Sequence, residues 1–152
     1  MTTEEAQTTR RIGGPEEAAY LDLVRTAEAL SHPLVQLLKT HELSVTQYNV
    51  LRILRGAPEG LTCGEVGNRM ITRDPDITRL LDRLEKRKLI ERARDDKDRR
   101  VVLTRITNAG HDLLVSLDGP VEQAHRRALG HLGLERLAQL SALLAACRAG
   151  LS

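Results

Sequence analysis

Aromatic residues are almost absent from this sequence. Phe and Trp do not occur, and Tyr occurs only twice in 152 residues. A core of this composition must be packed from aliphatic side chains, and a hydrophobic content of 41% is enough for one domain of this length. No apolar run approaches the roughly 20 residues that span a bilayer, and no signal-peptide pattern is present. We therefore expect a cytoplasmic protein that does not contact membranes.

Cysteine is nearly as scarce. Cys63 and Cys147 lie far apart in the sequence and form no CxxC pair, which fits a reducing compartment and argues against structural zinc. The five histidines include no close i, i+4 pair, so we expect no metal site. The chain also lacks a P-loop, a nucleophile elbow and a paired-carboxylate site. We therefore expect no catalytic residues, no cofactor and no enzymatic activity.

The segment that follows Met70 has the spacing of an amphipathic helix. Ile77, Leu80, Leu81 and Leu84 recur at i, i+3, i+4 and i+7, which places them in one apolar stripe. The opposite face carries charged residues, namely Asp76, Arg79, Asp82, Arg83 and Lys86. We predict that Asp74 is the N-cap and that Pro75 takes the first helical position. This helix is expected to be anchored on one side and basic on the other.

A hairpin is predicted directly after this helix. Residues 90–94 and 100–106 contain β-branched residues, and residues 95–99 form a polar turn between them. A turn this polar cannot belong to a core, so it must project into solvent or onto a polyanion. An amphipathic helix followed at once by a basic hairpin is the arrangement that lets a small domain touch two grooves of one DNA duplex.

Positive charge is concentrated in this segment. Residues 69–105 contain 13 Lys and Arg against 8 Asp and Glu, a net charge of +5, whereas the whole chain carries only +2. Such charge gives affinity for phosphate but no choice of sequence, which requires side chains at base edges. Arg79 or Arg83 could present a two-pronged contact to guanine. The alternative is an ordinary solvated helix face with pairs such as Asp82 and Lys86 at i, i+4; the hairpin favours DNA.

Two further helices are predicted upstream. Ser44 with Gln47 fits a capping box that opens a helix through about residue 55, and Thr62 with Glu65 fits another that opens a short helix toward residue 70. Together with the basic helix, these elements predict a compact helical lobe.

These residues also carry a resemblance. TRLLDRLEKRKLI followed by DRRVVLTRITNAG, with LTCGEVGNRM upstream, resembles the winged helix-turn-helix of MarR-family transcriptional regulators over roughly residues 43–114. The resemblance implies a mainly α fold with a small β-hairpin wing (α+β). Residues 15–152 would form a single domain, in which 43–107 are the DNA-binding lobe and 15–42 and 108–152 are dimerisation helices. Residues 1–14 show no periodicity and are expected to be disordered.

The resemblance also implies roles for individual residues. Asp98 and Arg100 match the family's Asp-x-Arg wing, in which the acid orients an arginine that enters the minor groove, and Thr78 with Arg79 match the Thr-Arg step of the recognition helix. A narrow minor groove has enhanced negative potential that attracts an inserted arginine. Arg100 is the first candidate for the arginine that enters the minor groove, and Arg99 is the second. The complete predicted DNA-binding set is Arg73, Asp76, Thr78, Arg79, Arg83, Lys86, Asp98, Arg99 and Arg100.

Two positions depart from the family pattern, and one further motif matches it. Lys88 stands where the family usually has a glycine, at a left-handed helix end that costs a non-glycine residue about 1 kcal/mol. Pro75 lies one residue closer to the Thr-Arg pair than in the commoner form. Thr107 and Gly110 match the motif that opens the next helix.

Three apolar seams outside the lobe suggest a second copy of the chain. They repeat in steps of three and four around Leu23, Leu117 and Leu137, and one lobe cannot bury them all. Intramolecular bundling is the alternative. Pro120 should interrupt the long helix after the hairpin as a kink or boundary, or as a hinge. The residues predicted to dimerise are Leu23, Leu30, Leu34, Leu117, Val121, Leu137, Leu140 and Leu144.

The sequence thus predicts a homodimeric regulator in the cytoplasm, at the nucleoid, that represses transcription from a palindromic operator in double-stranded DNA. The resemblance also implies that a small aromatic or anionic effector relieves the repression. One alternative is a winged-helix protein-interaction module that reads no DNA. Another is a redox-sensing repressor: Cys63 would follow the Thr62 N-cap, where free backbone N–H groups favour the thiolate.

Overall fold

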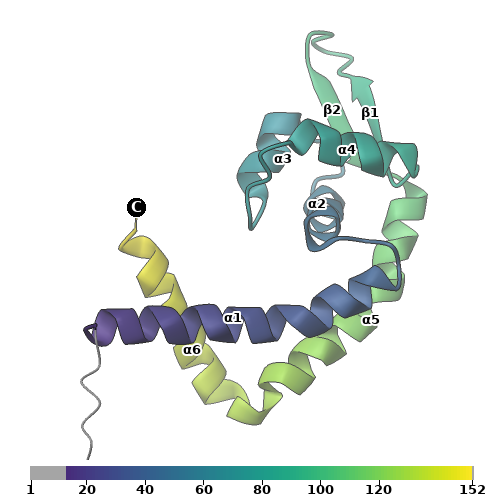
Figure 1. Cartoon of the computed structure of the whole chain (residues 1–152). Coiled ribbons are helices and arrows are strands. Elements are labelled where there is room, and N and C mark those ends of the chain that lie inside the picture. Colours follow the sequence, from purple (N-terminus) through teal and green to yellow (C-terminus); the bar gives the residue numbers. More distant parts are fainter. Residues whose placement is uncertain (1–12, 152) are drawn as a thin grey trace, which may run out of the picture. The chain divides into compact units, whose positions relative to one another are not determined.

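The computed structural model describes residues 13–151, so the expectation for residues 1–12 lies outside the described part. The described chain is mainly helical with one antiparallel hairpin, as predicted (Figure 1). Its elements are α1 (Pro15–Lys39), α2 (Val45–Arg55), α3 (Cys63–Arg69), α4 (Ile77–Lys86), β1 (Ile90–Arg94), β2 (Val102–Ile106), α5 (Asn108–Leu129), the 3-10 turn η1 (Gly130–Leu132) and α6 (Gly133–Ala149).

The described chain divides into two compact units, residues 13–32 and residues 33–151. The described part of the first unit is the beginning of α1, which exposes the apolar side chains of Tyr20, Leu23 and Val24 to solvent. The second unit contains the end of α1 and all the other elements. The core and the hairpin both belong to this second unit.

The core of the second unit is aliphatic, as the composition predicts. Among the described residues it is centred on fully buried leucines such as Leu51, Leu81 and Leu84, and Tyr48 is its one aromatic member. Burial of such side chains stabilises the fold by about 1.5–3 kcal/mol each. Leu117 and Val121 are also in this core, at 0% and 5% exposure. Their prediction as dimer contacts is therefore wrong, because one chain already buries them.

Both predicted capping boxes are present. The Ser44 hydroxyl accepts from the Gln47 N–H while the Gln47 side chain accepts from the Ser44 N–H, and Thr62 and Glu65 exchange the same pair of bonds. These bonds satisfy N–H groups that a helix start otherwise leaves free. They define where α2 and α3 begin.

The beginning of α4 differs from the prediction. Asp76 is the N-cap, because its carboxylate accepts the Arg79 N–H at 3.2 Å. Asp74 instead accepts the N–H of Asp76 at 2.8 Å, which closes a local turn around Pro75 ahead of the helix. Asp74 and Asp76 could each have capped the helix, but the carboxylate of Asp74 is already used by the turn.

The end of α4 contains a left-handed residue at the position where the resemblance expects glycine. Lys88 has φ +61°. Its N–H donates to the Glu85 carbonyl at 2.8 Å, and the Leu89 N–H donates to the Leu84 carbonyl at 3.1 Å. This pair of bonds is a Schellman motif, and it forms here in spite of the side chain of Lys88.

Helix α5 begins at a close contact and continues without a break. Thr107 is its N-cap and accepts the Gly110 N–H, as predicted. A Cβ on Gly110 would lie 2.2 Å from the Leu89 carbonyl oxygen, so only glycine fits there. Pro120 lies inside the helix, which runs on to Leu129. Pro120 is thus not the helix boundary that was one of its predicted roles.

Candidate nucleic-acid interface

Helix α4 presents distinct faces around its axis. Leu80, Leu81 and Leu84 are buried in the core, and Ile77 packs against it. Because successive residues turn by about 100°, Arg79 and Lys86 lie opposite this apolar stripe. The predicted DNA-contacting residues of this helix are all exposed, namely Thr78, Arg79, Arg83 and Lys86. Asp76 is occupied as the N-cap, and Arg73 is exposed in the preceding loop.

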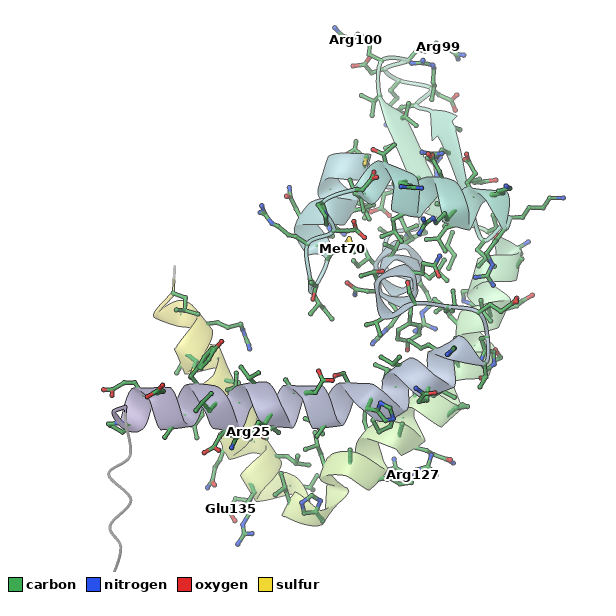
Figure 2. All side chains as sticks on the ribbon, viewed as in Figure 1. Arg25, Met70, Arg99, Arg100, Arg127 and Glu135 are labelled. Atoms are coloured by element: carbon green, nitrogen blue, oxygen red, sulfur yellow. The ribbon has the colours of Figure 1, made fainter. Side chains whose placement is uncertain are left out.

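The hairpin tip presents an arginine held by an acid. The Nε and Nη2 atoms of Arg100 donate to the two carboxylate oxygens of Asp98 at 3.1 and 3.2 Å, and the Arg100 backbone N–H donates to the same group. These hydrogen bonds hold the pKa of the Asp98 carboxyl below its ordinary value. Arg100 remains 91% exposed, and Figure 2 shows it with Arg99 at the far end of the hairpin. The geometry matches the pairing that the resemblance implies.

Backbone bonds shape this tip. The Val101 N–H donates to the Asp98 carbonyl at 2.9 Å, and the Asp95 N–H donates to the Val101 carbonyl at 2.8 Å. Consequently β2 begins at Val102, two residues later than predicted, because Arg100 and Val101 belong to the turn. Arg94, which the sequence analysis did not single out, donates to the Arg99 carbonyl at 2.7 Å. The hairpin tip is thus stabilised by hydrogen bonds among its own residues.

The root of the hairpin is fixed to the helical lobe through its second strand. Strands β1 and β2 pair from Ile90 with Ile106 to Arg94 with Val102. Thr104, which is 1% exposed, exchanges two backbone hydrogen bonds of 3.0 and 2.7 Å with Leu61 just before α3. This bridge attaches the hairpin to the start of α3.

The first strand is tied to α4 by a contact that the sequence analysis missed. Arg92 on β1 donates to the carboxylates of Glu85 and Asp82 on α4. The alternative of a solvated helix face with Asp82 paired to Lys86 is not what forms, because Asp82 pairs with Arg92. Helical spacing rules relate residues within one helix, so they contain no signal for a partner on the following strand.

The remaining predicted residues lie away from this surface or are partly covered. Cys63 is the first residue of α3, as predicted, and is half-buried against the core. Leu23 is 47% exposed in the first unit, while Leu30, Leu34, Leu137, Leu140 and Leu144 are half-buried. Helix α6 also exposes Leu134 and Leu143 at 89% and 66%.

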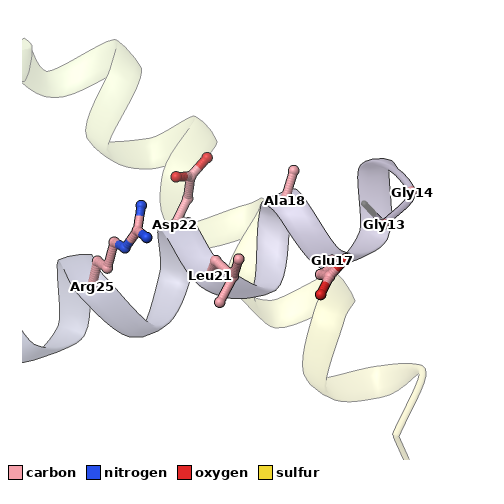
Figure 3. A pocket seen from close by; sticks show the side chains of 7 residues that line it. All are labelled: Gly13, Gly14, Glu17, Ala18, Leu21, Asp22 and Arg25. Carbon is pink, nitrogen blue, oxygen red and sulfur yellow. The ribbon is translucent and has the colours of Figure 1, made fainter. Parts of the chain in front are cut away.

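The described chain also has surface depressions that a small ligand could enter. One of about 210 Å³ follows the first turns of α1 and is lined by Gly13, Gly14, Glu17, Ala18, Leu21, Asp22 and Arg25 (Figure 3). Its charged groups come from a single helix and have both signs, as on a solvated helix face. Another of about 440 Å³ lies between the end of α1 and α5, against Pro33, Leu37, Ala124 and Arg127.

Within residues 13–151, no cluster of three or more His, Cys, Asp or Glu side chains could hold a metal ion. No described helix is both long and apolar enough to cross a membrane.

A helix with an exposed basic face, which shares its core with the two preceding helices and is followed by a hairpin with an arginine at its tip, defines a winged helix-turn-helix protein. Comparisons with known proteins agree. The family model described as MarR family matches residues 41–101. The crystal structure of a MarR transcription factor from Planctomyces limnophilus is 40% identical, with a TM-score of 0.68, covering 89% of this chain and 98% of that chain.

Two curated relatives are regulators as well. The HTH-type transcriptional regulator TtmR of Methylorubrum extorquens is 38% identical over 92 residues, which is 60% of this chain but only 47% of that protein's length. The homoprotocatechuate degradative operon repressor of Escherichia coli is 26% identical over 128 residues, 84% of this chain and 86% of the repressor. The chain belongs to the MarR family, and it is a DNA-binding transcriptional regulator.

Proposed function

We propose that the protein is a repressor that binds a palindromic operator as a homodimer. The observation that carries this proposal is the pairing of two exposed cationic elements in one unit, the basic face of α4 and the Asp98-held Arg100 of the hairpin. The relative from Escherichia coli is named as the repressor of an operon, which supports repression here. Such a regulator works in the cytoplasm, at the nucleoid.

Each part of the surface has a proposed contact. Thr78, Arg79 and Arg83 would enter the major groove, where an arginine can donate two hydrogen bonds to guanine. Arg73 and Lys86 would bind phosphates, which sets affinity and register but not sequence. Asp98, Arg99 and Arg100 would occupy the flanking minor groove, whose negative potential favours an inserted arginine. Asp76 would act indirectly, as the N-cap that fixes the start of α4.

Dimerisation is proposed through the ends of the chain. In this proposal residues 15–42 and 108–152 pair with their counterparts in a second copy, and residues 43–107 form the DNA-binding lobe. Leu23, Leu30, Leu34, Leu137, Leu140 and Leu144 remain candidates, because none of them is fully buried in one chain. A two-fold symmetric dimer would present two α4 helices to half-sites about 10 base pairs apart, or a multiple of that spacing.

Relief by a small aromatic or anionic effector is the regulatory part of the proposal. The Escherichia coli relative is named for an operon that degrades homoprotocatechuate, an aromatic acid. An effector of this class can act only if its affinity differs between the DNA-competent and DNA-incompetent arrangements of the protein.

Selection of bound fragments from random duplex DNA tests this function. We expect enrichment of an inverted repeat, and binding that weakens steeply as salt rises, because phosphate contacts release counterions. Enrichment of no sequence, together with salt-independent binding, would contradict the proposal. That result would favour the protein-interaction module, for which the charged hairpin would contact another protein.

A further inference from the structure

We propose that Arg92 is a positioning residue for DNA binding: by joining α4 to the hairpin, it sets the distance between the major-groove and minor-groove contacts. The inference rests on the proposed function, since it concerns how the two DNA-contacting elements are held. Arg92 itself would not contact DNA.

Arg92 joins β1 to two carboxylates on α4. The Arg92 Nε atom donates to Glu85 Oε2 at 3.3 Å, and Nη2 donates to Glu85 Oε1 at 2.9 Å, so the guanidinium engages this carboxylate through two nitrogens. Nη2 also donates to Asp82 Oδ1. Asp82 and Glu85 are one turn apart on α4, which places both on the flank of the helix that faces β1. One side chain therefore contacts two positions on the helix.

The contact between Arg92 and α4 is partly buried. The Arg92 side chain is only 23% exposed, whereas the other arginine pair of the hairpin exposes Arg100 at 91%. Hydrogen bonding from Arg92 holds the pKa of the Glu85 carboxyl below its ordinary value, and both acids raise the pKa of the Arg92 guanidinium. A partly desolvated fork of this kind has a more defined geometry than an exposed ion pair.

Arg92 lies in the middle of β1, between the core and the hairpin tip. Alternate residues of a strand share a face, so Ile90, Arg92 and Arg94 follow one another on the same side of β1. Ile90 is buried in the core, Arg92 binds α4, and Arg94 donates to the turn at the tip. Arg92 lies opposite Thr104, which is bonded to Leu61. At this pair of residues, β2 is bonded to Leu61 in the segment just before α3, and β1 is bonded to α4.

A simpler reading is that Arg92 only neutralises two carboxylates near the DNA. The two readings predict opposite signs for one experiment. In the Asp82→Asn/Glu85→Gln variant, two negative charges disappear from the recognition helix. Neutralisation alone would leave DNA affinity unchanged or increased, because repulsion of phosphates is removed. The positioning role predicts a loss of DNA affinity, because Arg92 then has no carboxylate on α4 to bind.

We therefore expect Arg92→Gln and Asp82→Asn/Glu85→Gln each to weaken binding to the selected duplex by about tenfold. In hydroxyl-radical footprints, the minor-groove protection beside each half-site should fade while major-groove protection from methylation persists. In either background, the further loss caused by Arg100→Ala should shrink to within about twofold, because the hairpin no longer has a fixed position. Arg92→Lys should behave like Arg92→Gln, since lysine lacks the two-nitrogen fork.

Arg52→Gln is the matched control. Arg52 is exposed on α2, outside the predicted DNA-binding set and outside the segments proposed to dimerise, so its loss should leave footprint and affinity unchanged. Amide hydrogen exchange of the free protein is the second measurement: exchange should accelerate in residues 92–104 of Arg92→Gln but not in α5.

Two outcomes separate this inference from the function on which it rests. Wild-type binding with full minor-groove protection in Arg92→Gln, or unchanged or tighter binding by Asp82→Asn/Glu85→Gln, would overturn the positioning role alone. A wild-type protein that binds no duplex at low salt would overturn both.

Discussion

Arg100 and Arg79 are exposed cations on different elements, and they should contribute to binding in different ways. Arg100 is held by Asp98 at the hairpin tip, whereas Arg79 lies on the outer face of α4. A contact at a groove wall adds affinity for many sequences, while a contact at a base edge adds discrimination. Mutation of each residue separates the two contributions.

Arg100→Ala should weaken binding to all duplexes and reduce the slope of log affinity against log salt by about one. Arg79→Ala should cost about 1–3 kcal/mol on the preferred sequence and little on a scrambled one. Titrations at several salt concentrations measure both effects. Arg52→Ala, an exposed change on α2, is the control. Equal losses on preferred and scrambled duplexes for Arg79→Ala would refute its assignment to base reading.

Lys88 has a left-handed backbone conformation that suits glycine better than lysine. Its φ of +61° is strained for lysine and relaxed for glycine. Lys88→Gly should therefore raise the free energy of unfolding by about 0.5–1 kcal/mol, once the greater entropy of glycine in the unfolded chain is subtracted. Urea unfolding measures the change. Lys86→Gly, in the last turn of the same helix, should instead destabilise by up to about 1 kcal/mol.

At the scale of the element, α5 offers two glycines with opposite surroundings. A Cβ on Gly110 would meet the Leu89 carbonyl oxygen at 2.2 Å, whereas a Cβ on Gly119 would have nothing within 4 Å. We expect Gly110→Ala to destabilise by about 1–3 kcal/mol, because the start of α5 must move away from the end of α4. Gly119→Ala should stabilise by about 0.5–1 kcal/mol. Thermal unfolding of the pair checks the contrast, and a stable Gly110→Ala protein would contradict the close approach.

The elements whose signals are local could be predicted from the sequence. Both capping boxes, the apolar stripe of α4 and the bounds of β1 depend on residues within a few positions of one another. The choice of Asp76 over Asp74 was missed because both acids suit a cap, and the structure uses one for the turn before the helix.

Contacts between elements could not be read in the same way. Nothing in the spacing of Arg92 shows that its partners are on α4, seven and ten residues earlier. The seam through Leu117 and Val121 has the same periodicity whether the covering surface belongs to this chain or to a second copy. Only the fold shows that these two side chains are in the core. Periodicity identifies a buried face but not what buries it.

At the scale of the whole molecule, the proposed dimer depends on apolar side chains that one chain leaves partly uncovered. On α6 these are Leu137, Leu140 and Leu144, which share one side of the helix. Ala142 is exposed on the opposite side. A change on one side should affect association, and a change on the other should not.

Leu140→Glu/Leu144→Glu should convert the dimer to a monomer at micromolar concentration, because two charges cannot be buried in an apolar interface without large cost. DNA affinity should then fall by about 100-fold, since two linked half-sites are replaced by one. Light scattering after gel filtration measures the mass. Ala142→Glu should leave both properties unchanged, and a dimeric Leu140→Glu/Leu144→Glu protein would exclude this face as the interface.

The scarcity of aromatic residues makes this protein convenient for fluorescence spectroscopy. Tyr20 lies in the first unit and is 64% exposed, while Tyr48 lies in the second, 5% exposed, with the Arg52 guanidinium 5.8 Å from its ring. With no tryptophan to dominate the emission, Tyr20→Phe leaves one emitter in residues 13–151 and Tyr48→Phe leaves the other. Quenching by iodide or acrylamide would then report separately on each unit, and a tryptophan placed in the hairpin would be the sole red-shifted signal when DNA binds.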